Sequence, residues 1–252
     1  MKNNNLSNLK LSLKKSISSN SLLTDKVLIF FSGGIDSSLI AFLVSKKIKK
    51  TFLLCVGLSG CFDFYQSEKV ASLLNLPLIK HEIPESNLSF LLSKTLSLVD
   101  KKDFVSVSFA LPFFVACEQA KNLGFKKVFS GHGADALFCG FDYFSKLAIE
   151  LKPSELELRR KLIVNDFINS LHSNEMKIAK HFDLELITPF SSDLVIKSGL
   201  AFSAKQCLAH KLKKAPLRKL AGELGLPSEI VNQKKKAFQY GTNIANKLKK
   251  IF

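Results

Sequence analysis

Short apolar runs alternate with longer segments of helical spacing through the first half of the chain. Buried strands are expected at four of these runs: 26–31, 51–58, 77–83 and 126–131. The residues between them predict helices at 37–48, at 66–75 and at about 86–98, followed by a longer apolar segment, 106–122. Strands that alternate with helices indicate an α/β fold, a doubly wound parallel sheet with right-handed crossovers.

The two ends of the chain differ from this alternating region. An amphipathic lead-in helix is expected within residues 1–25, where apolar side chains recur at helical spacing: Leu6, Leu9, Leu13 and Ile17. Residues 26–252 are expected to form one domain. Its sheet core would extend over about 26–145, and a helical part, about 146–252, would close over the edge of the sheet where ligands bind.

The composition excludes several classes of protein. With 252 residues, of which 46% are hydrophobic, the chain can bury a full core. Its five cysteines include no CxxC pair, which argues against a disulfide framework and against a zinc or iron–sulfur site and fits a reducing compartment. The lysines and asparagines of the first 25 residues do not form a secretory signal, and no apolar run has the length of a membrane span. A soluble, cytoplasmic protein is expected.

The net charge of +16 raises the question of a nucleic-acid partner. Residues 201–252 alone carry 12 Lys and Arg against two acids, a net charge of +10. Only three residues of the chain are arginines, however, and bidentate contacts to bases favour arginine, whereas lysine acts as a point charge toward phosphate. We therefore favour a lysine-rich solvated surface over a nucleic-acid face.

The stretch FFSGGIDSS, residues 30–38, lies where the first strand gives way to a helix. Such a turn places free backbone N–H groups and hydroxyls at a helix N-terminus, and its glycines let the backbone approach an anion closely. A helix cap alone would need one serine or aspartate, not the whole cluster. The loop lacks the lysine of the GxxxxGK[ST] motif, and its aspartate, Asp36, makes sense beside phosphates only with Mg²⁺ between them.

This loop resembles the SGGxDS loop of the ATP pyrophosphatases, the PP-loop superfamily, which cleave ATP between the α and β phosphates. Three further stretches are similar to those of asparagine synthetases, in the same order along the chain: VFSGHGADALFCGFDYF (128–144), DLELITPFSSD (183–193) and KAPLRKLAGELGLPSEIVNQKKKAFQYG (214–241). The resemblance covers about residues 26–242 and concerns the synthetase domain alone, without the N-terminal glutaminase domain. It implies a PP-loop fold with ATP and Mg²⁺ as ligands.

The resemblance implies roles for individual positions. Residues implied to bind ATP are Ser32, Gly33, Gly34, Asp36, Ser37 and Ser38 of the loop, the backbone of Val56, Gly57 and Leu58 beside adenine, and Ser130, Gly131 and Lys214. Asp36 and Asp135 are implied to hold Mg²⁺, although Asp135 also suits an Asx turn. Lys235, three residues before Phe238, is implied to neutralise charge on the leaving pyrophosphate. Its flanking lysines leave a solvated lysine run as the alternative.

His132 stands where the asparagine synthetases have glutamate and their β-lactam-forming relatives have tyrosine. That tyrosine pairs with the glutamate of the second motif, which is Glu185 here, so the resemblance implies a His132–Glu185 dyad that takes a proton from an incoming amine. A histidine that only caps a glycine-rich turn is the alternative. Ala136 departs from the glutamate of the family motif. Family arginines are missing at Ile187 and Gln233, and the aspartate of the PFLD motif is Ser192, which argues against aspartate as the substrate.

The function expected from these residues is a magnesium-dependent ligase that activates a carboxylate with ATP as acyl-AMP, releases pyrophosphate and transfers the acyl group to an amine or ammonia. Ammonia would be free or come from a separate glutaminase subunit. Two alternatives stay open: a PP-loop enzyme that adenylates a base carbonyl of tRNA, and a degenerate nucleotide-binding subunit. The basic tail favours tRNA and the missing CxxC pair opposes thiolation, whereas Asp36, Asp135 and Lys235 oppose degeneracy.

Overall fold

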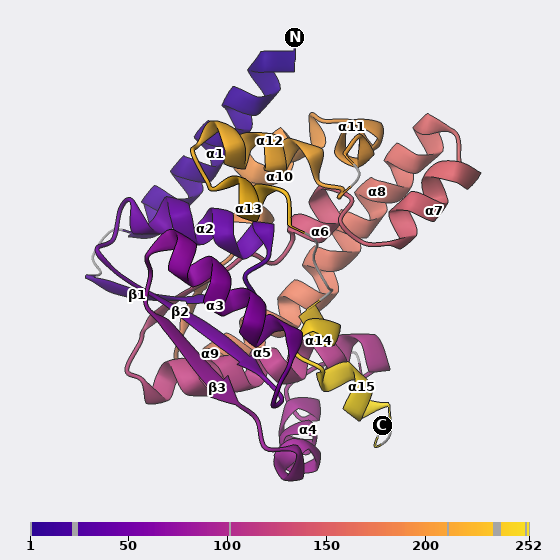
Figure 1. The fold of residues 1–252 in the computed structure, drawn as a ribbon. Helices are drawn as coiled ribbons and strands as arrows, with labels where there is room; N and C mark the ends of the chain where they lie inside the picture. Colours follow the sequence, from indigo (N-terminus) through magenta and orange to yellow (C-terminus); the bar gives the residue numbers. More distant parts are fainter. Residues whose placement is uncertain are drawn as a thin grey trace.

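One parallel sheet of five strands forms the centre of the molecule in the computed structural model, which describes residues 2–21, 25–100, 102–210, 212–233, 238–249 and 251. The strands are β1 (Lys26–Phe30), β2 (Lys50–Gly57), β3 (Leu78–Glu82), β4 (Lys127–Ser130) and β5 (Glu185–Ile187). Their order across the sheet is β3-β2-β1-β4-β5, and every pair is parallel. Helices surround this sheet (Figure 1). The predicted α/β fold with a doubly wound parallel sheet is confirmed.

Helices make up most of the rest of the described chain. In chain order they are α1 (Lys2–Ser21), α2 (Ile35–Ser45), α3 (Phe62–Leu74), the 3₁₀ turn η1 (Glu85–Asn87), α4 (Leu88–Leu96), α5 (Phe104–Asn122), α6 (Ala134–Leu137), α7 (Tyr143–Glu150), α8 (Pro153–Phe167), the π-helical turn η2 (Ile168–His172), α9 (Ser173–His181), the 3₁₀ turn η3 (Pro189–Ser191), α10 (Asp193–Leu200), α11 (Ala204–Leu208), α12 (Ala215–Glu223), α13 (Ser228–Val231), α14 (Phe238–Gly241) and α15 (Ile244–Leu248). None of the described helices combines the length and apolar character that crossing a bilayer requires.

Alternating side chains of β1 divide the core into two layers. Val27 and Ile29 point to one face, where they pack with α1, α2 and α12. Leu28 and Phe30 point to the other face, where they pack with α4, α5, α9 and α15. Because both faces are covered, the strands read as continuous apolar runs in the sequence rather than as alternating ones.

The lead-in helix is part of the main core. Its four apolar side chains at helical spacing are all buried, as predicted: Leu6, Leu9, Leu13 and Ile17. They belong to the same layer as α2, and α1 also contacts α10 and α12. The N-terminal helix therefore packs on the domain along the stretch from Leu6 to Ile17.

The fifth strand corrects the predicted division of the chain. β5 pairs with β4 through Lys127↔Glu185, Val128↔Leu186 and Phe129↔Ile187, so the sheet does not end near residue 145. The part expected to be helical thus contributes an edge strand. A strand of three residues is too short to show a periodic pattern in the sequence. β5 forms because its backbone pairs with the edge strand β4.

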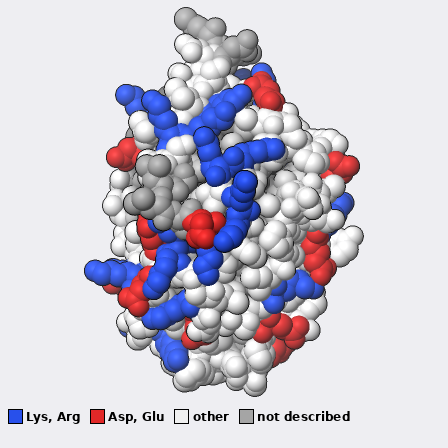
Figure 2. Space-filling view, turned by 90° about the vertical axis from the view of Figure 1, so that its left-hand side faces the viewer, with Lys and Arg blue, Asp and Glu red and all other residues white. Residues whose placement is uncertain are grey.

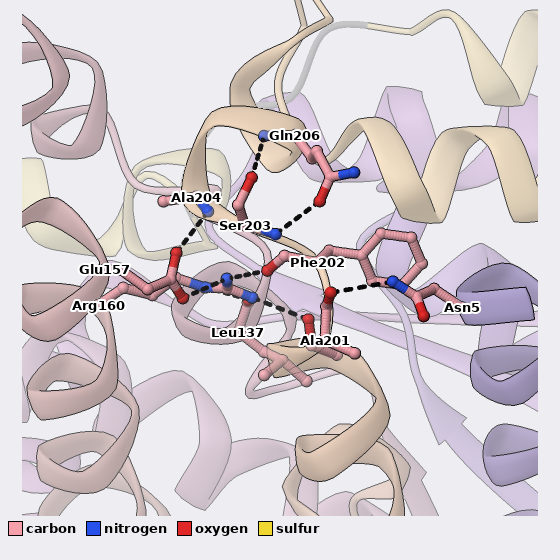
Figure 3. A network of polar contacts seen from close by, with 10 residues as sticks. Asn5, Leu137, Glu157, Arg160, Ala201, Phe202, Ser203, Ala204 and Gln206 are labelled. Carbon is pink, nitrogen blue, oxygen red and sulfur yellow. Dashed lines mark hydrogen bonds and ion pairs between the residues drawn. The ribbon is translucent and has the colours of Figure 1, made fainter. Parts of the chain in front are cut away.

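A buried arginine connects several helices of the molecule (Figure 3). Arg160 of α8 is fully buried, and its guanidinium donates to three backbone carbonyls, those of Leu137, Gly199 and Phe202. Glu157 lies 3.1 Å from the guanidinium and accepts a hydrogen bond of 2.7 Å from the N–H of Ala204, at the start of α11. These contacts join α6, which carries Asp135, to α8, α10 and α11.

Candidate active site

The two glycine-rich loops meet at one edge of the sheet. They follow β1 and β4, which are neighbours, so both lie at the carboxyl ends of parallel strands. A Cβ on Gly131 would lie 2.8 Å from the backbone nitrogen of Ser37, which shows how closely the second loop touches the first. Gly33 has φ +71°, and a Cβ there would lie 2.7 Å from the carbonyl oxygen of Gln66 in α3. Glycine is thus required at both positions by close packing and, at Gly33, by the left-handed backbone.

The serines of the first loop divide into two groups. Ser32 and Ser37 line a cavity at this edge of the sheet. Ser38 is fully buried, and its hydroxyl donates to the carbonyl of Gly34 at 2.8 Å, inside the first turn of α2. Ser32 and Ser37 also make local bonds with Gly34, at 3.4 and 3.2 Å. Ser32 and Ser37 therefore face the cavity, whereas the side chain of Ser38 stabilises the first turn of α2.

Lys214 joins two carboxylates that come from separate strand ends. Its Nζ lies 2.6 Å from Oδ2 of Asp36, at the start of α2, and 2.6 Å from Oδ1 of Asp135, in α6. Asp36 and Lys214 are both buried. Gly140 packs against this cluster, and a Cβ there would collide with the Asp135 carboxylate and the Lys214 side chain. The structure therefore brings together the two aspartates and the lysine that the sequence singles out.

Arg218 holds the turn that presents Lys214. Lys213 and Lys214 both adopt the left-handed backbone conformation, with φ of 59° and 52°, which is strained for residues with a Cβ. The Arg218 guanidinium donates to three carbonyls of this region, those of Leu212, Lys213 and Val231. Burial lowers the pKa of Arg218, and the negative charge of Asp36 opposes this shift. Sequence reasoning missed this role, although Arg218 stands in the same KxxLR stretch as Lys214.

Asp36 and Asp135 also suit a magnesium ion. Their oxygens contact one ammonium group, so the two carboxylates reach a common point. Carboxylate oxygens are the ligands that Mg²⁺ prefers, and the ion usually completes its shell with waters and substrate phosphates. Within the described part of the chain, no group of three or more His, Cys, Asp or Glu residues forms a metal cluster. The pair thus fits a metal ion that would be held jointly with phosphate.

A cavity of about 310 Å³ lies beside these charges. Polar and charged residues that line it include Ser32, Asp36, Ser37, Asp135 and Lys214. Apolar residues that line it include Phe30, Leu54, Val56, Phe109, Phe113 and Ala116. Ser130, Gly131 and His132, at the end of β4 and just beyond it, also face the cavity. One cavity therefore combines a charged part, an apolar part and an imidazole.

The partner of His132 is Glu175, and the expected pairing with Glu185 is wrong. Nδ1 of His132 contacts the carboxylate of Glu175 in α9, which is buried. Glu185 is exposed at the first position of β5, where its carboxylate lies 3.2 Å from Nζ of Lys127. Because Glu185 is in register with Lys127, it lies at the amino end of β4, at the opposite edge of the sheet from the cavity. The parallel pairing of β4 with β5 therefore keeps Glu185 away from His132.

Glu175 lies between two imidazoles. His172 approaches its other oxygen with Nδ1 at 3.5 Å, and Nε2 of His172 lies 3.4 Å from the hydroxyl of Thr188. Burial would raise the pKa of Glu175, but His132 and His172 outweigh burial and lower this pKa from 4.5 to about 2. The carboxylate is therefore ionised at neutral pH. Because it then accepts a hydrogen bond, Nδ1 of His132 carries the hydrogen and Nε2 is left as the basic nitrogen.

The sequence contains a signal for Glu175 that the motifs did not use. Glu175 shares one face of α9 with Ile178 and Ala179, and all three are buried. A carboxylate on the buried face of a short amphipathic helix needs a partner inside the protein. The identity of that partner could not be read from the chain, because His132 is 43 positions away.

The three residues expected beside adenine do not all face the cavity. Val56 lines the cavity. Gly57 and Leu58 do not belong to its lining and pack against Thr242 instead: the N–H of Leu58 donates to the Thr242 carbonyl at 3.1 Å, and a Cβ on Gly57 would lie 3.4 Å from Thr242 Cα. The C-terminal segment thus covers this part of the β2 end.

Lys235 lies outside the described residues. Two positions before it, the side-chain amide of Gln233 donates to the carbonyl of Gly33 and accepts from the amide of Gln66. The C-terminal segment is therefore in contact with the SGGxDS loop at Gln233. This glutamine replaces an arginine of the family motif and acts here as a bridge between the loop and α3.

Comparisons with known protein sequences agree with the motifs. A family model described as asparagine synthase matches residues 8–176 and 153–252. A Methanocaldococcus jannaschii protein assigned as a glutamine-hydrolysing asparagine synthetase is 32% identical over 213 residues, 82% of this chain and 38% of the relative. Asparagine synthetase 1 of Arabidopsis thaliana, also glutamine-hydrolysing, is 28% identical over 232 residues, 84% of this chain and 39% of the relative. Among solved structures, NMN synthetase from Francisella tularensis has a TM-score of 0.49 at 15% identity, over 92% of this chain and 77% of that one. This chain spans about two fifths of the length of the first two relatives.

Proposed function

This chain belongs to the asparagine synthase family, and we propose that it activates a carboxylate with ATP as an acyl adenylate and transfers the acyl group to ammonia or an amine. The observation that carries the proposal is the convergence of Asp36, Asp135 and Lys214 beside the cavity that His132 lines. The charged part of this cavity suits triphosphate. The imidazole with its buried carboxylate suits proton transfer from a nucleophile.

In the first step, an oxygen of the substrate carboxylate attacks the α-phosphorus of ATP, and the bond from that phosphorus to the oxygen bridging to the β-phosphate breaks. Pyrophosphate leaves with the bonding electrons. Ser32, Ser37 and the N-terminus of α2 bind the phosphates, and Lys214 lies close enough to the same site to neutralise developing charge. Mg²⁺ held by Asp36 and Asp135 would supply further positive charge to the phosphate oxygens. We assign the same task to Lys235 from its place in the motif.

In the second step, the nitrogen of ammonia or an amine attacks the acyl carbon, and the carbon–oxygen bond to AMP breaks. The nitrogen loses a proton, which passes to Nε2 of His132. Glu175 orients the ring through Nδ1 and stabilises the imidazolium that forms, as buried carboxylates do for catalytic histidines elsewhere. Ammonia would reach the site from solution or from a separate glutaminase subunit.

The first test is whether AMP forms from ATP in a reaction that needs Asp36. We expect purified protein with Mg²⁺, α-labelled ATP and pools of carboxylates and amines to release AMP and pyrophosphate together. Asp36→Asn should abolish both products, because it removes one carboxylate from the phosphate site and keeps the side-chain shape. Asp183→Asn is the matched control, since Asp183 is exposed and its partner is Lys121. Normal turnover by Asp36→Asn would contradict the proposed function.

A further inference from the structure

The second imidazole beside Glu175, that of His172, is held by three side chains. Its Nδ1 lies 3.5 Å from Oε2 of Glu175, and its Nε2 lies 3.4 Å from the hydroxyl of Thr188, directly after β5. The face of its ring stacks on Phe167, the last residue of α8, with centroids 6.1 Å apart and planes at 13°. Because these partners come from α9, α8 and the end of β5, the ring of His172 has little freedom to turn.

The stack on Phe167 results from the π-helical turn η2. Side chains five positions apart on an α-helix point about 140° away from each other around the axis. A π-helix bonds residue i+5 to residue i, and Phe167 directly precedes η2 while His172 ends it. Such single turns are rare and frequently lie at functional sites. The turn thus places His172 over Phe167, and a regular spacing of three positions then brings it to Glu175.

The Phe167 ring also borders the turn that follows His132. Gly133 has φ +92°, and a Cβ there would lie 3.4 Å from Cε1 of Phe167 and 2.9 Å from Oγ of Ser191. The ring that stacks on His172 therefore lies against the backbone next to His132. The two imidazoles share one phenyl neighbour as well as one carboxylate.

His172 decides which oxygen of Glu175 faces His132. The last torsion of a glutamate is broad, so burial alone does not fix its oxygens. His172 contacts Oε2, and His132 contacts Oε1. Among the described residues, the titratable groups that face Glu175 from other elements are these two imidazoles and the thiol of Cys117 on α5. Burial raises the pKa of the Cys117 thiol well above its ordinary value, so the thiol stays neutral and the imidazoles orient the carboxylate.

We propose that His172 is a positioning residue for the second step of the reaction: it fixes the carboxylate of Glu175, which in turn holds the hydrogen of His132 on Nδ1 and keeps Nε2 as the base. Phe167 and Thr188 fix His172 in its place. The inference rests on the proposed function and deepens it, because it assigns a task to side chains that the reacting atoms do not touch.

The first readout is the tautomer of His132, which needs no substrate. In the whole protein with ¹⁵N-labelled histidine, NMR should show the Nδ1 hydrogen as a low-field resonance that exchanges slowly with water and is lost in His132→Gln. His172→Phe keeps a ring for the stack and removes both nitrogens, so we expect this exchange to become about tenfold faster or more, the size of one hydrogen bond to a charged group. His172→Asn, whose amide can donate near the place of Nδ1, should restore most of the protection. His181→Phe is the matched control, because His181 is exposed on α9.

The second readout separates the two steps of the proposed reaction. With ATP, Mg²⁺ and the pooled carboxylates, exchange of labelled pyrophosphate into ATP reports the first step. The additional AMP released when ammonium chloride is added reports the second. His172→Phe should leave the exchange unchanged and slow the ammonia-dependent release by about tenfold or more. A residue with a merely structural role would lower both rates together.

Two results would overturn the inference. One is an Nδ1 hydrogen of His132 that is missing in the wild type or exchanges equally fast in His172→Phe. The other is an equal loss in both steps that His172→Asn does not restore. If His172→Phe does not fold, Thr188→Val, which removes the hydroxyl beside Nε2, takes its place in both comparisons. Absence of pyrophosphate exchange in the wild type contradicts the proposed function instead, and the NMR comparison still decides the inference.

Discussion

Buried charges at single residues define the chemistry of the cavity. Lys214 is held between two carboxylates, and Glu175 is held between two imidazoles. Each arrangement compensates a charge that would be costly alone in the interior. In the proposed function, the first arrangement serves phosphate and metal, and the second serves proton transfer to His132.

At the residue scale, the register of the C-terminal motif predicts that Lys235 acts in the reaction and that its neighbour Lys234 does not. Lys235→Ala should slow AMP formation by about a hundredfold or more, the loss expected for one transition-state charge donor. Lys234→Ala is the matched control and should leave the rate unchanged. The rates are measured with saturating ATP and Mg²⁺. A damaging Lys234→Ala with a harmless Lys235→Ala would move the assigned register by one residue.

Glu175 makes the stability of the fold depend on pH. Its pKa lies near 2 in the folded protein and near 4.5 when unperturbed, so its charge stabilises the fold above about pH 4.5, and this contribution is lost as the pH falls toward 2. Glu175→Gln should therefore lower the free energy of unfolding at pH 6, and its difference from wild type should shrink as the pH falls below 4.5. Urea titrations at several pH values measure this. Glu185→Gln, at an exposed carboxylate, should show no such pH-dependent difference, and the reverse pattern would restore the pairing that the structure contradicts.

At the scale of elements, short segments owe their positions to contacts with distant parts of the chain. α6 carries Asp135 and has only four residues. A helix of this length is not stable by itself and depends on tertiary contacts. Its last carbonyl, that of Leu137, accepts from Arg160, which also binds the end of α10 (Figure 3). The positions of α6, α8 and α10 are therefore coupled through one guanidinium.

Removal of that guanidinium should destabilise the whole domain. Arg160→Leu removes the cation beside Glu157 and the side-chain donor to three buried carbonyls, for which we expect a loss of about 3–5 kcal/mol. Chemical denaturation of both proteins at pH 7 measures the difference. Arg159→Leu is the matched control, because Arg159 is the exposed neighbour on the same helix. A change in stability no larger than that of the control would show that the network contributes little.

At the scale of the whole molecule, one group of lysines lies away from the cavity. Lys26, Lys50 and Lys127 begin three of the parallel strands, so they lie at the amino edge of the sheet, whereas the cavity lies at the carboxyl edge. β1 begins on the left-hand side of Figure 1, and Figure 2 shows lysine and arginine side chains gathered on that face of the molecule. The three lysines at the amino edge of the sheet are thus separate from the candidate active site.

The separation leads to a prediction about RNA. We expect tRNA to bind weakly, without preference over an unrelated RNA of the same length, and to dissociate at moderate salt, because lysines act as point charges toward phosphate and give only non-specific attraction. Filter binding across salt concentrations tests this. Tight, saturable binding that is selective for tRNA at physiological salt would favour the tRNA-modifying alternative over the ligase.

Local patterns in the sequence determined four strands, the buried stripe of α1 and the glycine-rich turn between β1 and α2. These features depend on residues a few positions apart, whose burial and hydrogen bonds are decided within one element. The sequence also identified Asp36, Asp135 and Lys214, although it did not show that the lysine lies between the two carboxylates.

The tertiary structure alone decided which distant residues meet. β5 exists through its pairing with β4, and the same parallel register places Glu185 at the edge opposite to His132. Glu175 reaches His132 because α9 packs on α5, a contact that no spacing along the chain encodes. Strand register and helix packing result from the burial of the whole core, so a motif can name a residue of the site while its partner is selected by the fold.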